Sequence, residues 1–364
     1  MRKLVVILLA FALVFMLAAC SGSTPAPAAS DEAAPAPAAT TETPDKPVSQ
    51  GEAVGDLGDT DMSVLGGLKI AFSQTGNSAP WRVMETESMQ AAADKYGATY
   101  MMTDAQEDNA KQLEDVRSII AWGPDYVIYN PREQEASSEG LRLLVDAGIP
   151  VVVPDRSCNW EEGDIITFIC NDFYDEAWLT AEFLLNNMGD YGFDKANIVE
   201  ITGTPGSSAA IERSQGFVEF VAQNSGAMEI VESQTGDFVR ETAMTTMENI
   251  IAAKKGEFNA VFAHNADMAV GAVNVLKAAG EGLVPGKDVL VMGIDELQTS
   301  IEMIVTGEVL AITTCSPLYG EDCFKAIAMY INGDPIPNPW VRVDEVIHKG
   351  NAQEYLDQNK VIPG

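Results

Sequence analysis

The chain has 364 residues, which at about 150 residues per domain suggests two domains beyond any targeting segment. Apolar residues make up 46% and charged residues 21%, a balance that excludes a wholly disordered chain and a polytopic membrane protein. With 22 Lys and Arg against 54 Asp and Glu, the formal net charge is −32. Because nucleic-acid affinity depends on cationic side chains, we expect no DNA or RNA partner.

The N-terminus has the organisation of an export signal. Two basic residues precede an apolar run over residues 4–17, and two alanines stand immediately before Cys20. A helix of that run spans about 21 Å, short of the roughly 30 Å hydrocarbon core of a membrane, so we predict cleavage rather than a retained span. The sequence therefore predicts a signal peptide over residues 1–19.

The residues that end this signal resemble a bacterial lipobox, in which the cysteine becomes a lipidated N-terminus. The alternative is an ordinary export signal with an incidental cysteine. We expect lipidation at Cys20 and an extracytoplasmic protein anchored to a bacterial membrane, at the cell surface or in the periplasm. Residues 20–66, rich in Ala, Pro, Ser and acidic residues, are expected to form a disordered tether.

The rest of the chain alternates short apolar runs with segments of helical spacing. Strands are predicted at 68–72, 99–102, 126–129, 150–154, 197–202, 228–235, 260–263 and 289–294. Helices are predicted at 81–96, 110–121, 136–147, 177–188, 208–225, 240–254 and 266–279. Apolar strands separated by helices are typical of parallel sheets covered on both faces, so the sequence predicts an α/β protein of two doubly wound parallel-sheet lobes.

Polar residues follow the predicted strands in both halves. Parallel sheets bind ligands at the carboxyl ends of their strands, so these residues are candidate ligand contacts. Asp, Asn and Arg hold hydroxyls in fixed geometries, and Trp or Phe covers the C–H face of a sugar ring, a combination that suits a carbohydrate. Each residue also has a structural alternative: Trp81 as core, Asp295 as a helix cap, Arg156 in a surface ion pair and Asn265 as a strand terminus.

Sequence signatures of enzymes are missing. The chain has no dinucleotide-binding glycine motif, phosphate-binding loop or nucleophile elbow, and its two histidines, His264 and His348, make a histidine-based metal site or relay improbable. We expect no catalytic residue, metal or cofactor; Asp155 and Asp295 as a carboxylate pair for sugar hydrolysis are the alternative. The cysteine pairs 158/170 and 315/323 are disulfides or free thiols, and spacing leaves both open.

From about residue 67 to the C-terminus the sequence resembles the type I periplasmic sugar-binding proteins of ABC importers, and most of all their galactofuranose-binding branch. The stretches that carry the resemblance are Phe72-Ser73-Gln74, Trp81-Arg82 with Glu85-Thr86, Asp155-Arg156-Ser157, residues 209–213, 234–238, 263–268 and 285–288, and Gly293-Ile294-Asp295. One position departs from the pattern: Cys315 stands where a polar amide is expected, and a thiol is a weak hydrogen-bonding group.

The resemblance implies a three-strand hinge between an N-terminal lobe (67–172 plus 316–343) and a C-terminal lobe (173–315 plus 344–364). It also implies ligand contacts at Ser73, Trp81, Arg82, Glu85, Asn130, Asp155, Arg156, Arg213, Phe238, Asn265, Asp267, Asp295 and Cys315. Trp81 and Phe238 would be the apolar walls. Arg82 and Glu85, at i and i+3 of one helix, would bind the exocyclic hydroxyls of a furanose; a solvated ion pair is the alternative.

The function implied is capture of a monosaccharide, such as a galactofuranose, and its delivery to the transmembrane subunits of an ABC permease. The protein would act as a monomer held to the membrane by its N-terminal lipid. A sensory module that presents the sugar to a membrane receptor is the alternative of another class.

Overall fold

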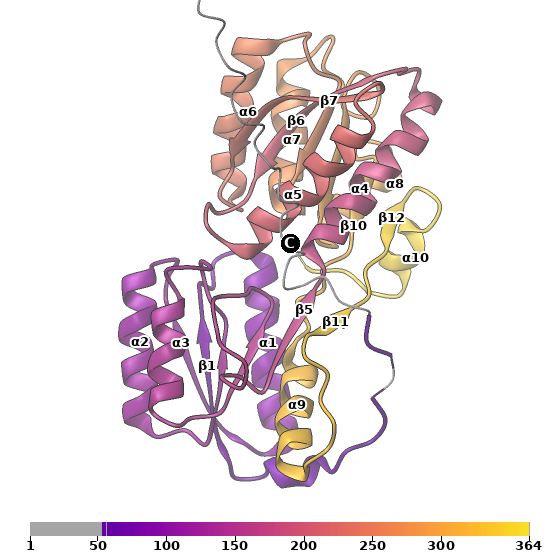
Figure 1. Ribbon diagram of the computed structural model, residues 1–364. Helices are drawn as coiled ribbons and strands as arrows, with labels where there is room; N and C mark the ends of the chain where they lie inside the picture. The colour runs from indigo at the N-terminus through magenta and orange to yellow at the C-terminus, as the bar shows by residue number, and fades with distance from the viewer. Residues whose placement is uncertain (1–52, 56, 364) are drawn as a thin grey trace, which may run out of the picture. The chain divides into compact units, whose positions relative to one another are not determined.

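The computed structural model describes residues 53–55 and 57–363, and the predicted signal peptide, Cys20 and most of the predicted tether lie outside them. Two six-stranded sheets organise the described chain (Figure 1). The first sheet has the order β11-β5-β4-β3-β1-β2 and is parallel throughout. Its strands are β1 (Lys69–Gln74), β2 (Thr99–Asp104), β3 (Tyr126–Tyr129), β4 (Val151–Pro154), β5 (Thr167–Asn171) and β11 (Trp340–Arg342).

The second sheet has the order β12-β10-β9-β8-β6-β7 and is parallel except for the antiparallel pair β10 and β12. Its strands are β6 (Ala196–Thr202), β7 (Met228–Thr235), β8 (Ala260–Ala263), β9 (Leu290–Ile294), β10 (Ala311–Thr313) and β12 (Val346–His348). We call the two sheets with their helices the first and the second lobe. The two doubly wound lobes predicted from the sequence are confirmed.

Helices flank each sheet (Figure 1). The first lobe contains η1 (Met62–Leu65), α1 (Pro80–Tyr96), α2 (Asn109–Trp122), α3 (Ser138–Asp146) and α9 (Gly320–Asn332). The second contains α4 (Phe173–Asn187), η2 (Met188–Tyr191), α5 (Ser208–Gln223), α6 (Arg240–Lys254), α7 (Ala266–Ala279), α8 (Gln298–Thr306) and α10 (Ala352–Asp357). Each lobe has two clusters of buried apolar residues, as expected for a sheet covered on both faces.

Local sequence signals explain where the helices next to the strand ends begin and stop. The Ser207 hydroxyl caps α5 by accepting from the backbone N–H of Ala210, and the Asn265 side chain caps α7 by accepting from Met268. Gly97 ends α1 in the left-handed conformation, at φ 71°, which a residue without a Cβ adopts at little cost. The two caps fix the ends of the loops that follow β6 and β8, and Gly97 fixes the turn from α1 into β2.

The chain crosses between the lobes three times: after β5, between β10 and α9, and between β11 and β12. Asp344, in the third crossover, joins all three. Its carboxylate accepts hydrogen bonds from Nδ2 of Asn171 at 2.7 and 2.9 Å and from Oγ1 of Thr314 at 2.9 Å. Burial raises the pKa of Asp344 to about 7, against the effect of these two hydrogen bonds. The strands of each sheet come from the residue ranges given to each lobe above, and the exact lobe boundaries stay a prediction.

The last part of the predicted tether belongs to the first lobe. Leu65 is fully buried in its core, Nζ of Lys325 on α9 donates to the Gly58 carbonyl at 2.8 Å, and Oγ1 of Thr60 donates to Asp334 at 2.7 Å. The prediction of a disordered segment is therefore wrong for residues 57–66. The segment is polar on average, so its composition did not indicate that a few apolar residues within it pack beneath α9.

Among the described residues, Cys158, Cys170, Cys315 and Cys323 are buried free thiols, so of the two alternatives left open the structure has thiols rather than disulfides. Within the same part of the chain, no helix is long and apolar enough to cross a membrane.

Candidate functional site

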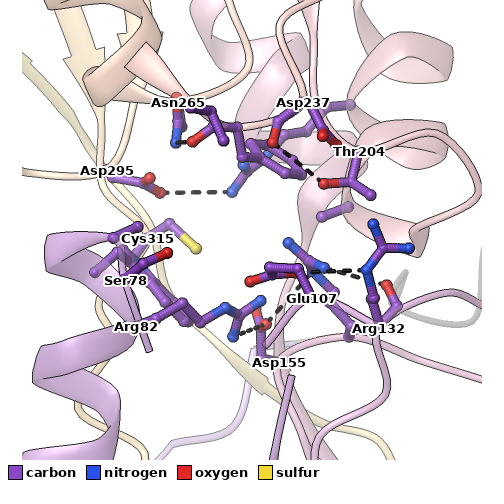
Figure 2. Close-up of a pocket in the computed structure, with 17 residues that line it drawn as sticks. Ser78, Arg82, Glu107, Arg132, Asp155, Thr204, Asp237, Asn265, Asp295 and Cys315 are labelled. Carbon is purple, nitrogen blue, oxygen red and sulfur yellow. Dashed lines mark hydrogen bonds and ion pairs between the residues drawn. The ribbon is translucent and has the colours of Figure 1, made fainter. Parts of the chain in front are cut away.

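A cavity of about 190 Å³ lies between the two lobes, at the carboxyl ends of both sheets (Figure 2). We call it the cleft pocket. Nine of the residues predicted as ligand contacts line it: Trp81, Arg82, Asp155, Arg156, Arg213, Phe238, Asn265, Asp295 and Cys315. They come from both lobes and from the second crossover, so the strand-end pattern and the fold agree on one location.

Four predicted contacts do not line the cleft pocket. Ser73 is fully buried in β1, and Asn130 lies beneath the pocket with its Nδ2 donating to Oε1 of Glu85 at 2.9 Å. Glu85 is itself fully buried behind Arg82, so a direct contact between Glu85 and exocyclic hydroxyls is wrong. Asp267 accepts from Nε of Arg240 at 2.9 Å, which holds its carboxylate outside the lining.

In the first lobe, Arg82 connects a buried carboxylate to one in the pocket. Its Nη1 lies 2.8 Å from Oε2 of Glu85 and 2.7 Å from Oδ2 of Asp155. Burial opposes the charge on Arg82, but Asp155 and Glu85 together raise the pKa of Arg82 above its usual value. Burial raises the pKa of Glu85 to about 7 even though Arg82 opposes the shift. The guanidinium therefore stays charged and is held toward Asp155.

The second lobe repeats this arrangement. Oε2 of the fully buried Glu176 lies 2.8 Å from Nη2 of Arg213, whose Nη2 lies 3.7 Å from Oδ1 of Asp295 (Figure 2). Nη1 of Arg213 also donates to the His264 carbonyl at 2.7 Å. Burial raises the pKa of Asp295 to about 7, against the charge of Arg213. Each lobe thus contains one pair of an arginine and a strand-end aspartate, with a buried glutamate behind the arginine.

His264 supports this site from beneath rather than lining it. Its Nε2 lies 3.0 Å from Oε1 of Glu200, and its Nδ1 accepts from the Gly203 backbone N–H at 3.3 Å. Burial lowers the pKa of His264, so the neutral ring, donating from Nε2 and accepting at Nδ1, fits both contacts. His264 is a packed residue at a strand end.

The loops that form the pocket are strained. Among the described residues, seven that are not glycine have positive φ, and five of these line the pocket: Glu107, Asp155, Asp237, Phe238 and Asp295. Such conformations cost about 1–3 kcal/mol each and persist where the surrounding structure requires them. Their concentration at one cavity marks it as the candidate functional site.

Two aromatic rings form apolar surfaces of the pocket. Trp81 donates from Nε1 to the Cys315 carbonyl at 2.6 Å and also packs against the cores of both lobes, so it is a core residue and a wall at once. The Phe238 ring lies 5.2 Å from the guanidinium carbon of Arg156. It occupies the space above Gly203, where a Cβ would overlap the ring.

Sequence reasoning missed several residues of the lining. They are Ser78, Ala79, Glu107, Arg132, Thr204, Ala209, Asp237 and Val239. Thr204, Asp237 and Glu107 stand in the loops that follow β6, β7 and β2. The strand-end rule applies to these loops as well and is the signal by which they could have been found.

The lobes also touch each other at the side of the pocket away from the crossovers. The backbone N–H of Gln134 donates to the Gly206 carbonyl at 2.8 Å, and that of Ser157 donates to Oγ of Ser208 at 2.9 Å. In the described part of the chain, no group of three or more His, Cys, Asp or Glu residues could hold a metal ion. The site is a cavity between two lobes in contact, lined by charged side chains and two aromatic surfaces.

Comparisons with known proteins agree with this architecture. Residues 70–335 match the periplasmic binding protein domain. The galactofuranose-binding protein of Escherichia coli is 31% identical over 305 residues, which cover 83% of this chain and 94% of that protein.

Two solved structures are similar at a comparable level. The periplasmic binding protein component of the arabinose ABC transporter from Shewanella sp. ANA-3, bound to α- and β-L-arabinofuranose, has a TM-score of 0.74 and 32% identity, over 80% of this chain and 95% of that one. A Mycobacterium smegmatis protein in complex with β-D-fucofuranose has a TM-score of 0.75 and 30% identity, over 81% and 95%. The resemblance seen in the sequence is confirmed, and the chain belongs to the periplasmic binding protein domain family.

Proposed function

We propose that this protein binds one monosaccharide in furanose form in the cleft pocket and delivers it, chemically unchanged, to an ABC importer. The observation that carries the proposal is the pair of Arg–Asp contacts, Arg82 with Asp155 and Arg213 with Asp295, facing one cavity from opposite lobes. A sugar hydroxyl both donates and accepts, so an arginine beside an aspartate serves each hydroxyl in both roles.

The charges of the lining favour a neutral ligand. Four arginines and four carboxylates line the pocket: Arg82, Arg132, Arg156 and Arg213 with Glu107, Asp155, Asp237 and Asp295. Glu85 and Glu176 lie directly behind two of the arginines and offset their charge further. An anionic sugar acid would therefore meet carboxylates without a surplus of cations, whereas an uncharged sugar needs no such surplus.

The ring form is inferred from the relatives. Their names or ligands are galactofuranose, L-arabinofuranose and β-D-fucofuranose. D-Fucose is 6-deoxy-D-galactose, and L-arabinose has the configuration of D-galactose without its sixth carbon. As furanoses the three share one ring and differ in the exocyclic chain. We infer that the pocket of this chain takes a furanose of this configuration.

Isothermal titration calorimetry of the mature chain with D-galactose, D-fucose, L-arabinose, D-ribose and D-glucose tests the ligand. Tight binding of at least one of the first three, with the sugar recovered unchanged after denaturation, is expected. Binding restricted to D-glucose, which is overwhelmingly pyranose in water, or conversion of the recovered sugar would overturn the proposal.

The predicted anchoring of the protein to a membrane is part of the same proposal. Lipidation at Cys20 would hold the protein at the outer face of a membrane, beside the permease that accepts the sugar. Expression of the full chain and of Cys20→Ser in a bacterium, followed by fractionation, tests this. Wild type should sediment with membranes and the variant should not; equal release of both would contradict lipid anchoring.

A further inference from the structure

The cleft pocket has two ends, and Figure 2 shows Cys315 and Ser78 on one side of it and Glu107 and Arg132 on the other. Cys315 and Ser78 stand at the hinge end, beside the second crossover. Glu107 and Arg132 stand at the mouth end, next to the loop whose Gln134 bonds to the second lobe.

Hydrogen-bonding capacity at the hinge end is largely used within the protein. Trp81 gives its only side-chain donor to the Cys315 carbonyl, and the thiol of Cys315 is a weak partner. The Asn265 amide accepts from Met268 and donates to the Phe238 carbonyl. A ligand hydroxyl placed at this end would find few free partners.

Capacity at the mouth end is only partly used: Nη1 of Arg132 pairs with Glu133, and Nη1 of Arg156 donates to the Arg132 carbonyl at 3.1 Å. Arg156 is 6% exposed, and its Nε has no hydrogen-bond partner. Nε of Arg132 likewise has no hydrogen-bond partner, and Oε2 of Glu107 lies 3.5 Å from it. The charge of Glu107 also favours the charged forms of Arg82 and Arg156, against the effect of burial on their pKa values.

The position of Glu107 is built into the chain. Gln106 and Glu107 both have left-handed backbone, at φ 54° and 58°, an arrangement that costs free energy in the turn. The Glu107 side chain fills the space beside Gly76, where any Cβ would overlap it. Loops after three strands of the first sheet therefore cooperate to hold one carboxylate over the mouth of the pocket.

We propose that Glu107 and Arg132 form a subsite for the terminal hydroxyl of an exocyclic glycol, so that the pocket selects hexofuranoses over shorter furanoses. This inference rests on the proposed function. A carboxylate beside a guanidinium accepts from and donates to one hydroxyl, and Nε of the neighbouring Arg156 is free for the hydroxyl on the carbon before it. The exocyclic chain then points away from Arg82 and Glu85, to which the sequence analysis assigned it.

D-galactose, D-fucose and L-arabinose test the subsite, because only D-galactose carries the terminal hydroxyl on a six-carbon chain with the shared ring. Calorimetry is done on wild type, Glu107→Gln and Arg132→Gln. Both variants should bind D-galactose about tenfold more weakly, the effect of losing a hydrogen bond to a charged group. Their affinity for D-fucose and L-arabinose should stay within twofold of wild type. Only a small fraction of each sugar is furanose in solution, which lowers every apparent affinity. This factor is the same for variant and wild type, so it drops out of the ratio of their affinities for one sugar.

Two controls locate the effect. Glu135→Gln, an exposed carboxylate of the same loop region, should leave all three affinities unchanged. Cys315→Ala, at the hinge end, should change all three by a similar factor. Melting temperatures of each variant show whether it is folded, and weakening confined to one sugar is not a consequence of lost stability.

The outcomes separate this inference from the function beneath it. If wild type binds the three sugars and the two variants weaken all of them equally, the furanose function stands and the subsite is wrong. If Cys315→Ala alone abolishes the preference for D-galactose, the glycol lies at the hinge end and the subsite is likewise wrong. If wild type binds none of the three, the proposed ligand class fails and the subsite with it.

Discussion

Oε2 of Glu176 lies 2.8 Å from both Nε and Nη2 of Arg213, and the glutamate is fully buried. Two contacts to one oxygen fix the plane of the guanidinium and leave Nη1 to the His264 carbonyl. Glu176 thus orients a pocket arginine without reaching the pocket. Glu85 has the same relation to Arg82 in the other lobe.

Glu176→Gln should weaken sugar binding about tenfold, because a neutral amide holds the guanidinium less firmly than a carboxylate does. Removing the charge of Glu176 also leaves the buried Arg213 without its ion-pair partner, so the melting temperature of the variant should fall as well. Calorimetry and thermal melting measure the two effects. Glu182→Gln, exposed on the same helix, is the control. A fall in melting temperature without loss of affinity would mean that Glu176 serves stability alone.

Affinity should depend on pH through Asp295, whose pKa burial raises to about 7. An ionised Asp295 accepts from a sugar hydroxyl, so affinity should fall as the pH is lowered from 8 to 5.5. The stability of the unliganded protein should change in the opposite sense. A carboxyl whose pKa is raised by folding contributes stability that is fully present when the pH is below its pKa in the unfolded chain. That contribution is lost as the pH rises through about 7, the pKa of Asp295 in the folded protein.

Asp295→Asn separates these two effects. The variant should lose the pH dependence of affinity and keep part of that of the melting temperature, since the pKa values of Glu85 and Asp344 are also raised to about 7. Titrations with the same sugar across this pH range, on wild type and variant, provide the check. An affinity of wild type that is constant with pH would refute the role given to Asp295.

Gly203→Ala should reduce affinity by displacing the Phe238 ring. The added Cβ would overlap the ring, which can move only toward the pocket or out of the lobe contact. Gly226→Ala is a matched control, since a Cβ there meets nothing within 4 Å. Binding by Gly203→Ala equal to that of the control would show that Phe238 is not a wall of the ligand site.

Ser208→Ala should weaken binding about two- to tenfold without touching the ligand. It removes the acceptor for the Ser157 backbone N–H, one of the bonds between the lobes, and a neutral hydrogen bond contributes about 0.5–1.5 kcal/mol. Calorimetry gives the affinity, and small-angle scattering without ligand should show a larger radius of gyration. Ser225→Ala, exposed at the other end of the same helix region, should match wild type in both measurements.

The sequence was informative where a residue follows a fully buried strand of four or five residues. Asp155 and Asp295 each come directly after such a strand, and the structure places both in the pocket. Strands of three residues, such as β10 and β12, are too short to show a pattern, so these strands could not be predicted from hydrophobic periodicity.

Residues behind the pocket were beyond sequence reasoning for a different reason. Glu176 and Arg213 are 37 positions apart and meet only because α4 packs against α5. For Glu85, the i to i+3 spacing correctly brought it to Arg82, but spacing does not say which of the two faces the sheet. The position of a residue after a strand therefore predicts whether it lines the pocket. Which residues orient the pocket side chains from behind depends on how the helices pack.

Asp344 has a consequence for how the cleft opens. Any turn of one crossover shifts this carboxylate relative to Asn171 or Thr314, and so strains the hydrogen bonds that the other two crossovers make with it. We therefore expect the three linkers to turn together rather than one at a time. Because the Gln134–Gly206 hydrogen bond lies on the side away from the linkers, we expect the lobes to separate there when the cleft opens.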